Sequence, residues 1–309
     1  MDRSGLVLLV SLAAIAMLPG GQTASAAGAS HGASHGAGIP DFAGMWWHPS
    51  LPGFEPMASG PRPVTNRSRR SNGVENYDQL VGDYTNPILK PEAAAVVKKH
   101  GEISLAGVTY PNPANQCWPE PVPFIYKSFG LQILQSRDHI TMLYDADHQV
   151  RHVRLNQPHP ANVKPSWYGD SVGHYEGDTL VIDTVGTRID RPYEMLDLYG
   201  TPYSKALHVV ERYRLIDYEA AKDGLERDLK ENQPAEGKID RSYRGKHLQL
   251  QFTVEDEGVF TSPWSATVTY RPASIADVTE WPENVCSENT HEYYNNKDSD
   301  VPVAAKPDF

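Results

Sequence analysis

Two carboxylate side chains share a face of a predicted strand with apolar residues, which makes them the first candidates for catalytic residues. Glu211 falls on the apolar side of the run Leu207–Tyr213, and Asp183 shares its side of Thr179–Val185 with Val181. A lone buried charge is costly, so such a carboxylate must pair, accept several hydrogen bonds or stay protonated. Because desolvation raises the pKa of a carboxylic acid, Glu211 and Asp183 are predicted to act as general acids or bases.

A structural role is the alternative for both carboxylates. Glu211 would then be paired with an arginine such as Arg154 or Arg188. Asp183 would accept hydrogen bonds from loop amides instead of transferring protons. The residue pattern leaves both interpretations open.

Histidines near these carboxylates supply groups that titrate close to neutral pH. His159 stands in a proline-rich loop, where functional residues are common, and His208 precedes Arg212 by four residues on one strand face. His159 and His208 are therefore predicted as catalytic partners of the carboxylates. The ligand-binding residues predicted from the same stretches are Arg212, as an anchor for an oxyanion or carboxylate, with Trp167, Tyr175 and His174.

Neither a metal nor an organic cofactor is predicted. A zinc site needs three or four converging ligands. His148 and His152 have helical spacing but fall where the chain turns into a strand, so that four residues span about 13 Å. His31 and His35 lie in a Gly/Ala/Ser-rich linker. The chain also lacks the glycine-rich, P-loop, H-E-x-x-H and G-x-S-x-G motifs.

The elements that must position these residues are predicted to be short antiparallel strands. Apolar and polar residues alternate through His247–Glu255 and Trp264–Arg271, a pattern typical of half-buried strands. Such strands, each with one apolar face, predict a mainly β fold with a closed or nearly closed antiparallel barrel, and a β-sandwich is the alternative because sequence alone does not reveal closure. Further strands are predicted at Leu131–Gln135, Ile140–Tyr144, Val150–Leu155, Thr179–Val185 and Leu207–Arg214, with Ser171–Thr184 as a hairpin turning at Glu176-Gly177-Asp178.

Helices are predicted at two places. Pro91–His100 has proline in its first turn and Gly101 to end it. Tyr218–Glu231 is highly charged and is interpreted as a surface insertion. Trp46 and Trp47 are expected to anchor a proline-rich arm on the barrel.

The N-terminal residues predict export. An apolar run, Leu6–Leu18, follows Arg3, and Ala24-Ser25-Ala26 supplies the small residues that precede a signal-peptidase cut. The run is shorter than the roughly 20 residues of a membrane span, although an uncleaved anchor is the alternative. The predicted segments are a signal peptide at 1–26, a flexible linker at 27–40, an arm with a short helix at 41–110, a β-barrel domain at 111–295 and a disordered tail at 296–309.

Charge and cysteine content narrow the setting further. The formal net charge of −11 argues against nucleic acid or an anionic membrane surface as a partner, and no later segment is apolar enough for membrane insertion. Cys117 and Cys286 are the only cysteines, and export would place them in an oxidising compartment. A Cys117–Cys286 disulfide is therefore predicted, with two separate buried thiols as the alternative.

Several stretches together carry a family resemblance: Pro40-Asp41-Phe42-Ala43-Gly44-Met45-Trp46, Cys117-Trp118-Pro119, His159-Pro160, Pro165–Thr184, Leu207–Tyr213 and Cys286-Ser287-Glu288-Asn289. This pattern resembles a large family of exported, mostly uncharacterised bacterial proteins with a lipocalin-like β-barrel character. The resemblance spans nearly the whole mature chain and implies the barrel and a periplasmic setting, without a settled activity. His174 stands where the family pattern has Arg and Tyr175 where it has Trp, so a ligand touching them would differ from the family's.

The prediction for function is a periplasmic or secreted enzyme that needs no cofactor. It would act by acid–base chemistry, as a lyase or isomerase, on a small hydrophobic or aromatic molecule bound in the barrel. Glu211 would be the acid or base and His208 or His159 its partner. The alternatives are a non-catalytic periplasmic carrier of a hydrophobic ligand and, more remotely, an assembly protein whose arm at 41–82 docks a partner. The sequence does not indicate an oligomeric state.

Overall fold

The computed structural model describes residues 38–49, 52–192, 194–231, 242–273 and 286. All of them belong to one compact unit of the chain, residues 35–309. The predicted signal peptide, most of the predicted linker and the predicted C-terminal tail lie outside the described residues. No helix within the described ranges is long and apolar enough to cross a membrane.

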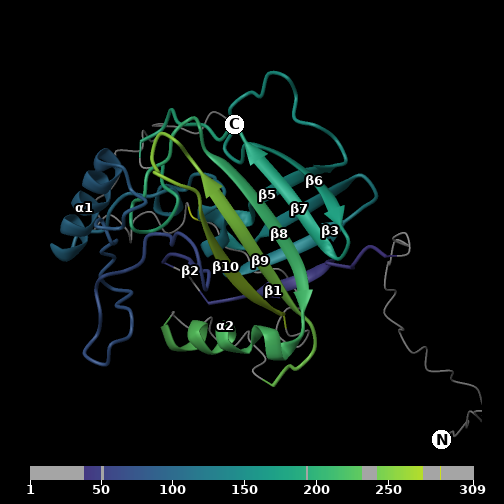
Figure 1. The fold of residues 1–309 in the computed structure, drawn as a ribbon, viewed down its shortest axis with the longest axis horizontal. Coiled ribbons are helices and arrows are strands. Elements are labelled where there is room, and N and C mark those ends of the chain that lie inside the picture. Colours follow the sequence, from purple (N-terminus) through teal and green to yellow (C-terminus); the bar gives the residue numbers. More distant parts are fainter. Residues whose placement is uncertain (1–37, 50–51, 193, 232–241, 274–285, 287–309) are drawn as a thin grey trace, which may run out of the picture. The chain divides into compact units, whose positions relative to one another are not determined.

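A closed barrel is the centre of the fold, as predicted (Figure 1). Its strands follow one another around the ring in chain order, and pairing of the first with the last closes it, which excludes the β-sandwich. The ring consists of β1 (Gly44–Trp47), β3 (Gly130–Gln135), β4 (His139–Tyr144), β5 (Val150–Leu155), β6 (Asp170–Glu176), β7 (Thr179–Val185), β8 (His208–Ile216), β9 (His247–Glu255) and β10 (Trp264–Pro272), while β2 (Glu55–Pro56) pairs with β10 outside it.

One junction of the barrel is parallel, which the sequence did not predict. Arg154 and Leu155 of β5 pair in parallel with Val172 and Gly173 of β6. A parallel junction needs a crossover connection, and residues 156–169 supply it as a long proline-rich loop. The loop carries His159 onto the outer surface of the barrel, where it becomes part of the site described below.

The first barrel strand comes from the segment predicted as an arm. Trp46 of β1 pairs with Leu131 on one side and with Pro272 on the other, so this short strand closes the ring. The barrel therefore begins at Gly44 and not at residue 111. Trp46 and Trp47 are buried, as expected of anchors. Two neighbouring residues of this strand, Trp46 and Trp47, are both buried, so it shows no period of two and the pattern missed it.

Helix α1 (Pro91–Leu105) begins at the predicted proline but runs past the predicted end. Gly101 does not end the helix. This glycine is buried, and an added Cβ would lie 3.0 Å from a methyl group of Val81. Close packing therefore accounts for Gly101. Short 3₁₀ helices lie at Ala114–Gln116, Phe124–Lys127 and Ala146–His148.

Helix α2 (Tyr218–Glu231) has the predicted bounds but is more than a charged insertion. Ala221 and Leu225 are buried and form a small cluster with Ile216 at the end of β8. The helix therefore packs its apolar face against the outside of the barrel, where it contacts β9 and β10.

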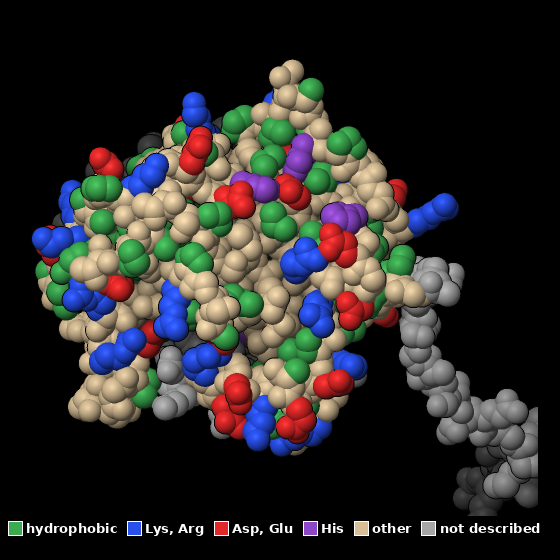
Figure 2. All heavy atoms as spheres, in the orientation of Figure 1, with side chains coloured by type: hydrophobic (Ala, Val, Ile, Leu, Met, Phe, Trp, Pro, Cys, Tyr) green, Lys and Arg blue, Asp and Glu red, His purple; other side chains and the backbone are tan. Residues whose placement is uncertain are grey.

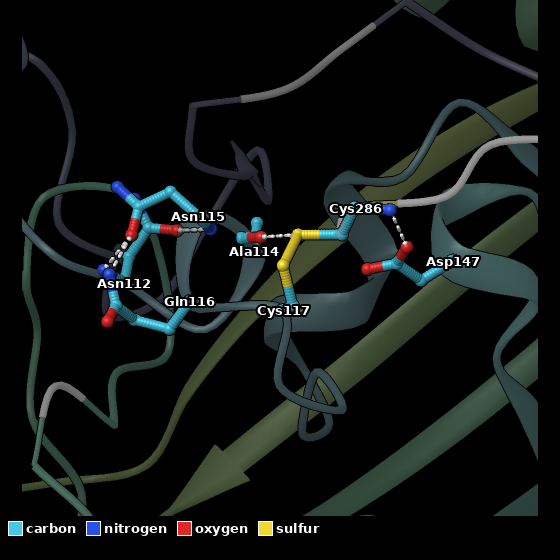
Figure 3. Close-up of a disulfide and its surroundings, with 7 residues drawn as sticks. All are labelled: Asn112, Ala114, Asn115, Gln116, Cys117, Asp147 and Cys286. Carbon is cyan, nitrogen blue, oxygen red and sulfur yellow. Dashed lines mark hydrogen bonds between the residues drawn. A yellow bond between two sulfur atoms is a disulfide. The ribbon is translucent and has the colours of Figure 1, made fainter. Parts of the chain in front are cut away.

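The predicted disulfide is present and joins Cys117 to Cys286 over a sequence separation of 169 residues (Figure 3). Asp147 accepts a hydrogen bond from the Cys286 amide at 2.5 Å, and the Cys286 sulfur lies 3.2 Å from the Ala114 carbonyl oxygen. The bridge thus ties the segment before β3 to the late part of the chain.

Candidate active site

The strands β7 and β8 carry polar clusters on both of their faces. The inner cluster lies inside the barrel around Glu211, and the outer cluster lies on the barrel surface around Asp183. The predicted catalytic residues are divided between the two.

Glu211 points into the barrel, as its strand parity predicts, and its side chain is 0% exposed. Arg151 on β5 grips both of its carboxylate oxygens, at 2.9 and 2.5 Å, and Tyr213 donates its hydroxyl to the same group at 2.9 Å. Arg151 also donates to Ser171 and Thr184. Glu211 is thus paired with an arginine, but with neither of the two named from the sequence.

This pairing decides what Glu211 can do chemically. Burial alone would lower the pKa of Arg151, but the adjacent Glu211 raises the pKa well above its ordinary value. Both carboxylate oxygens are engaged by donors of the protein itself, and Tyr126 and Tyr144 are buried in the same core. The structure favours the structural interpretation of Glu211, because no oxygen is left to take a substrate proton.

Asp183 shares its face of β7 with Val181, as its parity predicts, but this is the outer face of the strand and not the face that lines the barrel core. The inward residues of β7 are Leu180, Ile182 and Thr184, whereas Asp183 points outward and its side chain is 39% exposed. Both faces of β7 carry apolar residues, since Val181 lies on the outer face and is also buried. Period-two parity could not tell the faces of such a strand apart.

On the outer face, Asp183 holds two imidazole rings. His159 donates from Nε2 to one carboxylate oxygen at 2.9 Å, and His208 donates from Nε2 to the other at 3.0 Å. Figure 2 shows histidine and acidic side chains gathered on this surface, over β7 and β8. The hydrogen bond from His208 is the main cause of the lowered pKa of Asp183, and the same bond raises the pKa of His208. The structure thus brings together three of the four predicted catalytic residues.

His159 is bonded at both ring nitrogens. Its Nδ1 lies 2.6 Å from Asp170, whose two oxygens also accept hydrogen bonds from Arg154 at 2.7 and 3.0 Å. The bonds from Arg154 are the main cause of the lowered pKa of Asp170. Both ring nitrogens of His159 are thus committed to carboxylates of the protein itself. His159 is a positioning group in this arrangement.

His208 differs because its second nitrogen is only loosely held. Nδ1 lies 3.4 Å from Glu255 on β9, and the Glu255 side chain is 51% exposed. One ring nitrogen is oriented by a carboxylate and the other faces an accessible surface. This is the arrangement by which a third group orients a catalytic base.

The predicted ligand-binding residues do not converge on His208. Arg212 shares its strand face but pairs with Glu176, which also accepts a hydrogen bond from His174 at 3.0 Å. Tyr175 packs against the core, with its hydroxyl accepting a hydrogen bond from Gln135 at 2.8 Å. The remaining residue, Trp167, stacks under the guanidinium of Arg188, 4.5 Å from the ring centre.

Sequence reasoning missed the partners that complete the outer cluster. Asp170 opens the hairpin that contains three of the predicted residues, His174, Tyr175 and Asp183, and its charge was the one available signal. Arg154 reaches the cluster through the unpredicted parallel junction, and Glu255 lies opposite His208 in the β8–β9 register. Both depend on strand pairing, which a local pattern does not contain.

Comparisons with known proteins identify no relative. No protein-family model matches the chain, and neither the curated proteins nor the solved structures contain a match. Within the described part of the chain, no group of three or more His, Cys, Asp or Glu side chains is arranged to hold a metal ion. Function is therefore inferred from the hydrogen-bonded geometry of the outer cluster.

Proposed function

We propose that this protein is an extracytoplasmic enzyme that acts by general acid–base catalysis without a cofactor, and that His208 transfers the proton. The observation that carries the proposal is the unequal engagement of the two His208 nitrogens. Asp183 holds Nε2 at 3.0 Å, whereas Glu255 approaches Nδ1 only to 3.4 Å.

Asp183 sets the chemistry of the ring. When His208 is neutral, its Nε2–H group donates a hydrogen bond to Asp183. The lone pair on Nδ1 is then available to accept a proton from a substrate. When Nδ1 is protonated, the same nitrogen is an acid. Asp183 is itself held by His159, and the Asp170–Arg154 pair holds His159 in turn. The chain of contacts fixes the base in one orientation.

The reaction class follows from what one acid–base group can accomplish. Taking a proton from one substrate atom and returning it to another atom, or to a leaving group, is the chemistry of isomerases and lyases. The substrate would bind on the outer surface of the barrel. Arg212 stands four residues along β8 from His208, about 13 Å away along the backbone, and is paired with Glu176. Arg154 is the cation joined to the cluster by hydrogen bonds, through Asp170 and His159.

The test is an untargeted metabolite screen with the purified mature protein, followed by variants. We expect His208→Gln to abolish any turnover found and Asp183→Asn to reduce it. His152→Gln is the matched control, because His152 is an exposed histidine on β5, outside the cluster. If His208→Gln folds and turns over substrate like the wild type, the proposal fails. A ligand that co-purifies unchanged, with no turnover, would favour the carrier alternative.

Export is part of the same proposal. It is supported by the signal-peptide pattern of residues 1–26 and by a disulfide that an oxidising compartment maintains. The resemblance to an exported bacterial family agrees with it. N-terminal sequencing of the protein released from the periplasm is expected to begin after Ala26, and recovery of the full-length chain from the cytoplasm alone would contradict export.

A further inference from the structure

A pocket distant in sequence from the His208 cluster lies among three loop segments. It has a volume of about 550 Å³ and is lined by residues within 60–65, 83–88 and 261–262. This volume lies in the range of small-molecule sites, roughly 300–1,000 Å³. None of its lining residues belongs to the outer cluster around Asp183. The inference that follows does not rest on the proposed function.

Hydrogen bonds between the segments fix the walls of the pocket. The side-chain amide of Asn86 donates hydrogen bonds to the backbone carbonyl oxygens of Arg62 and Pro63, at 3.0 and 3.1 Å. Thr261 donates its hydroxyl to the Pro87 carbonyl at 3.0 Å and its backbone amide to the Ile88 carbonyl at 2.8 Å. The shape is therefore preformed, and a ligand would not have to order these loops.

The lining surface is mixed, with apolar groups in modest excess over polar ones. Prolines contribute no backbone donor, and the carbonyls of Arg62, Pro63, Pro87 and Ile88 are already occupied. What remains is the ring surfaces of the prolines, the Ile88 side chain and a few hydroxyl groups. Such a surface fits a compact apolar molecule that bears one polar group.

The charges at the pocket decide what that polar group is. Asp83 is engaged through one oxygen: its Oδ1 accepts hydrogen bonds from the backbone amide and hydroxyl of Thr85, at 3.1 and 2.6 Å, and lies 3.9 Å from Arg67. Arg62 is exposed and its guanidinium makes no hydrogen bond or ion pair with another described residue. In a chain of net charge −11, this arginine is a cation at a concave site, and no described carboxylate contacts it.

We infer that this pocket binds a small organic acid, with its apolar body against the proline walls and its carboxylate on Arg62. The guanidinium can meet a carboxylate with two parallel hydrogen bonds, which a neutral or cationic analogue of the same shape cannot accept. The pocket therefore selects by charge.

Ligand-observed NMR and calorimetry with benzoate, benzyl alcohol and benzylamine test this on the full chain. The three probes share a ring and differ in charge. We expect the wild type to bind benzoate, and to bind the other two at least about tenfold more weakly. Arg62→Gln is expected to weaken benzoate about tenfold, and Arg62→Lys to weaken it less.

Arg137→Gln is the matched control, because Arg137 is an exposed arginine in the turn between β3 and β4, away from the pocket. It is expected to bind benzoate like the wild type. The side chain of Arg62 contacts no other described residue through a hydrogen bond or ion pair, so its variants should fold normally, which circular dichroism will verify. Any of three results would overturn the inference: no benzoate binding, equal binding of benzylamine, or unchanged binding by Arg62→Gln.

Discussion

At the scale of single residues, the fold places a stabilising ion pair inside the barrel and the titratable pair of Asp183 and His208 on its outer surface. Arg151 and Glu211 form a pair inside the barrel with side-chain exposures of 1% and 0%. Asp183, two strands from β5 around the same ring, faces outward and leaves one nitrogen of His208 accessible. The charges of a buried ion pair contact fixed protein partners in place of water. The Asp183–His208 dyad is only partly buried, so it can still exchange protons with a substrate.

Glu211→Gln is predicted to destabilise the protein by about 3–5 kcal/mol, because it leaves the Arg151 guanidinium buried without a counter-charge. Chemical denaturation would measure the loss. The double variant Arg151→Met, Glu211→Leu removes both charges and is expected to recover much of the stability. A single variant within about 1 kcal/mol of the wild type would contradict the buried-charge account.

The dyad on β7 and β8 makes a prediction about pH. Asp183 raises the pKa of His208, so the stabilisation from the charged His208 is fully present below the unfolded-state pKa, about 6.5, and is lost as the pH rises through the raised folded value. The lowered pKa of Asp183 adds stabilisation that is lost as the pH falls through its folded value. The Asp183–His208 pair therefore stabilises fully between the two unfolded-state pKa values, 3.8 and 6.5, and the stabilisation declines as the pH moves beyond either of them toward the folded value.

An NMR titration of the ring protons measures this directly. Asp183→Asn is expected to lower the pKa of His208, because the ring loses the charge of Asp183. Glu255 then remains as the carboxylate beside the His208 ring. The same substitution also changes the partner of His159 Nε2. The ring signals of His152 serve as the internal control and should titrate alike in both proteins. An unchanged His208 curve would remove the Asp183 contact as the cause.

At the scale of elements, the hairpin of β6 and β7 shows how backbone geometry places the site. Both Gly169, before β6, and Gly177, in the turn, have positive φ, of 68° and 61°. An added Cβ at Gly169 would lie 2.6 Å from the Val185 carbonyl oxygen, whereas at Gly177 it would meet nothing within 4 Å. Gly169 thus permits the close approach at which Asp170 enters the sheet.

Gly169→Ala and Gly177→Ala therefore form a matched pair of substitutions. Each carries the left-handed backbone penalty of roughly 1–2 kcal/mol, but only Gly169→Ala adds a clash with backbone. We expect Gly169→Ala to lower the melting temperature clearly more than Gly177→Ala. Equal effects would mean that the crowding at Gly169 relaxes without cost.

At the scale of the whole molecule, ring closure and one covalent bridge join distant parts of the chain. β1 closes the barrel between β3 and β10, and the disulfide joins Cys117 to Cys286. Chain-entropy reasoning predicts that closing a loop of this length stabilises the fold by about 5 kcal/mol. Strand pairing and cross-linking thus hold the barrel together at this scale.

Cys117→Ser with Cys286→Ser is expected to lower the free energy of unfolding by up to about 5 kcal/mol. Denaturation of wild type and variant, each with and without dithiothreitol, would show it. The reductant should destabilise only the wild type. Insensitivity of the wild type to reduction, with its thiols shown to be free afterwards, would contradict a stabilising bridge.

The sequence by itself determined the local elements. Period-two alternation located most strands, the bounds of α2 matched, and parity placed Glu211 on the buried face, because these features depend on neighbouring residues alone. Only the tertiary structure decided that the ring closes, that β5 and β6 pair in parallel, and that Arg151 is the partner of Glu211 from 60 residues away. It also decided that Asp183 faces outward between two histidines, since strand pairing and crossover loops join residues whose proximity no local period records.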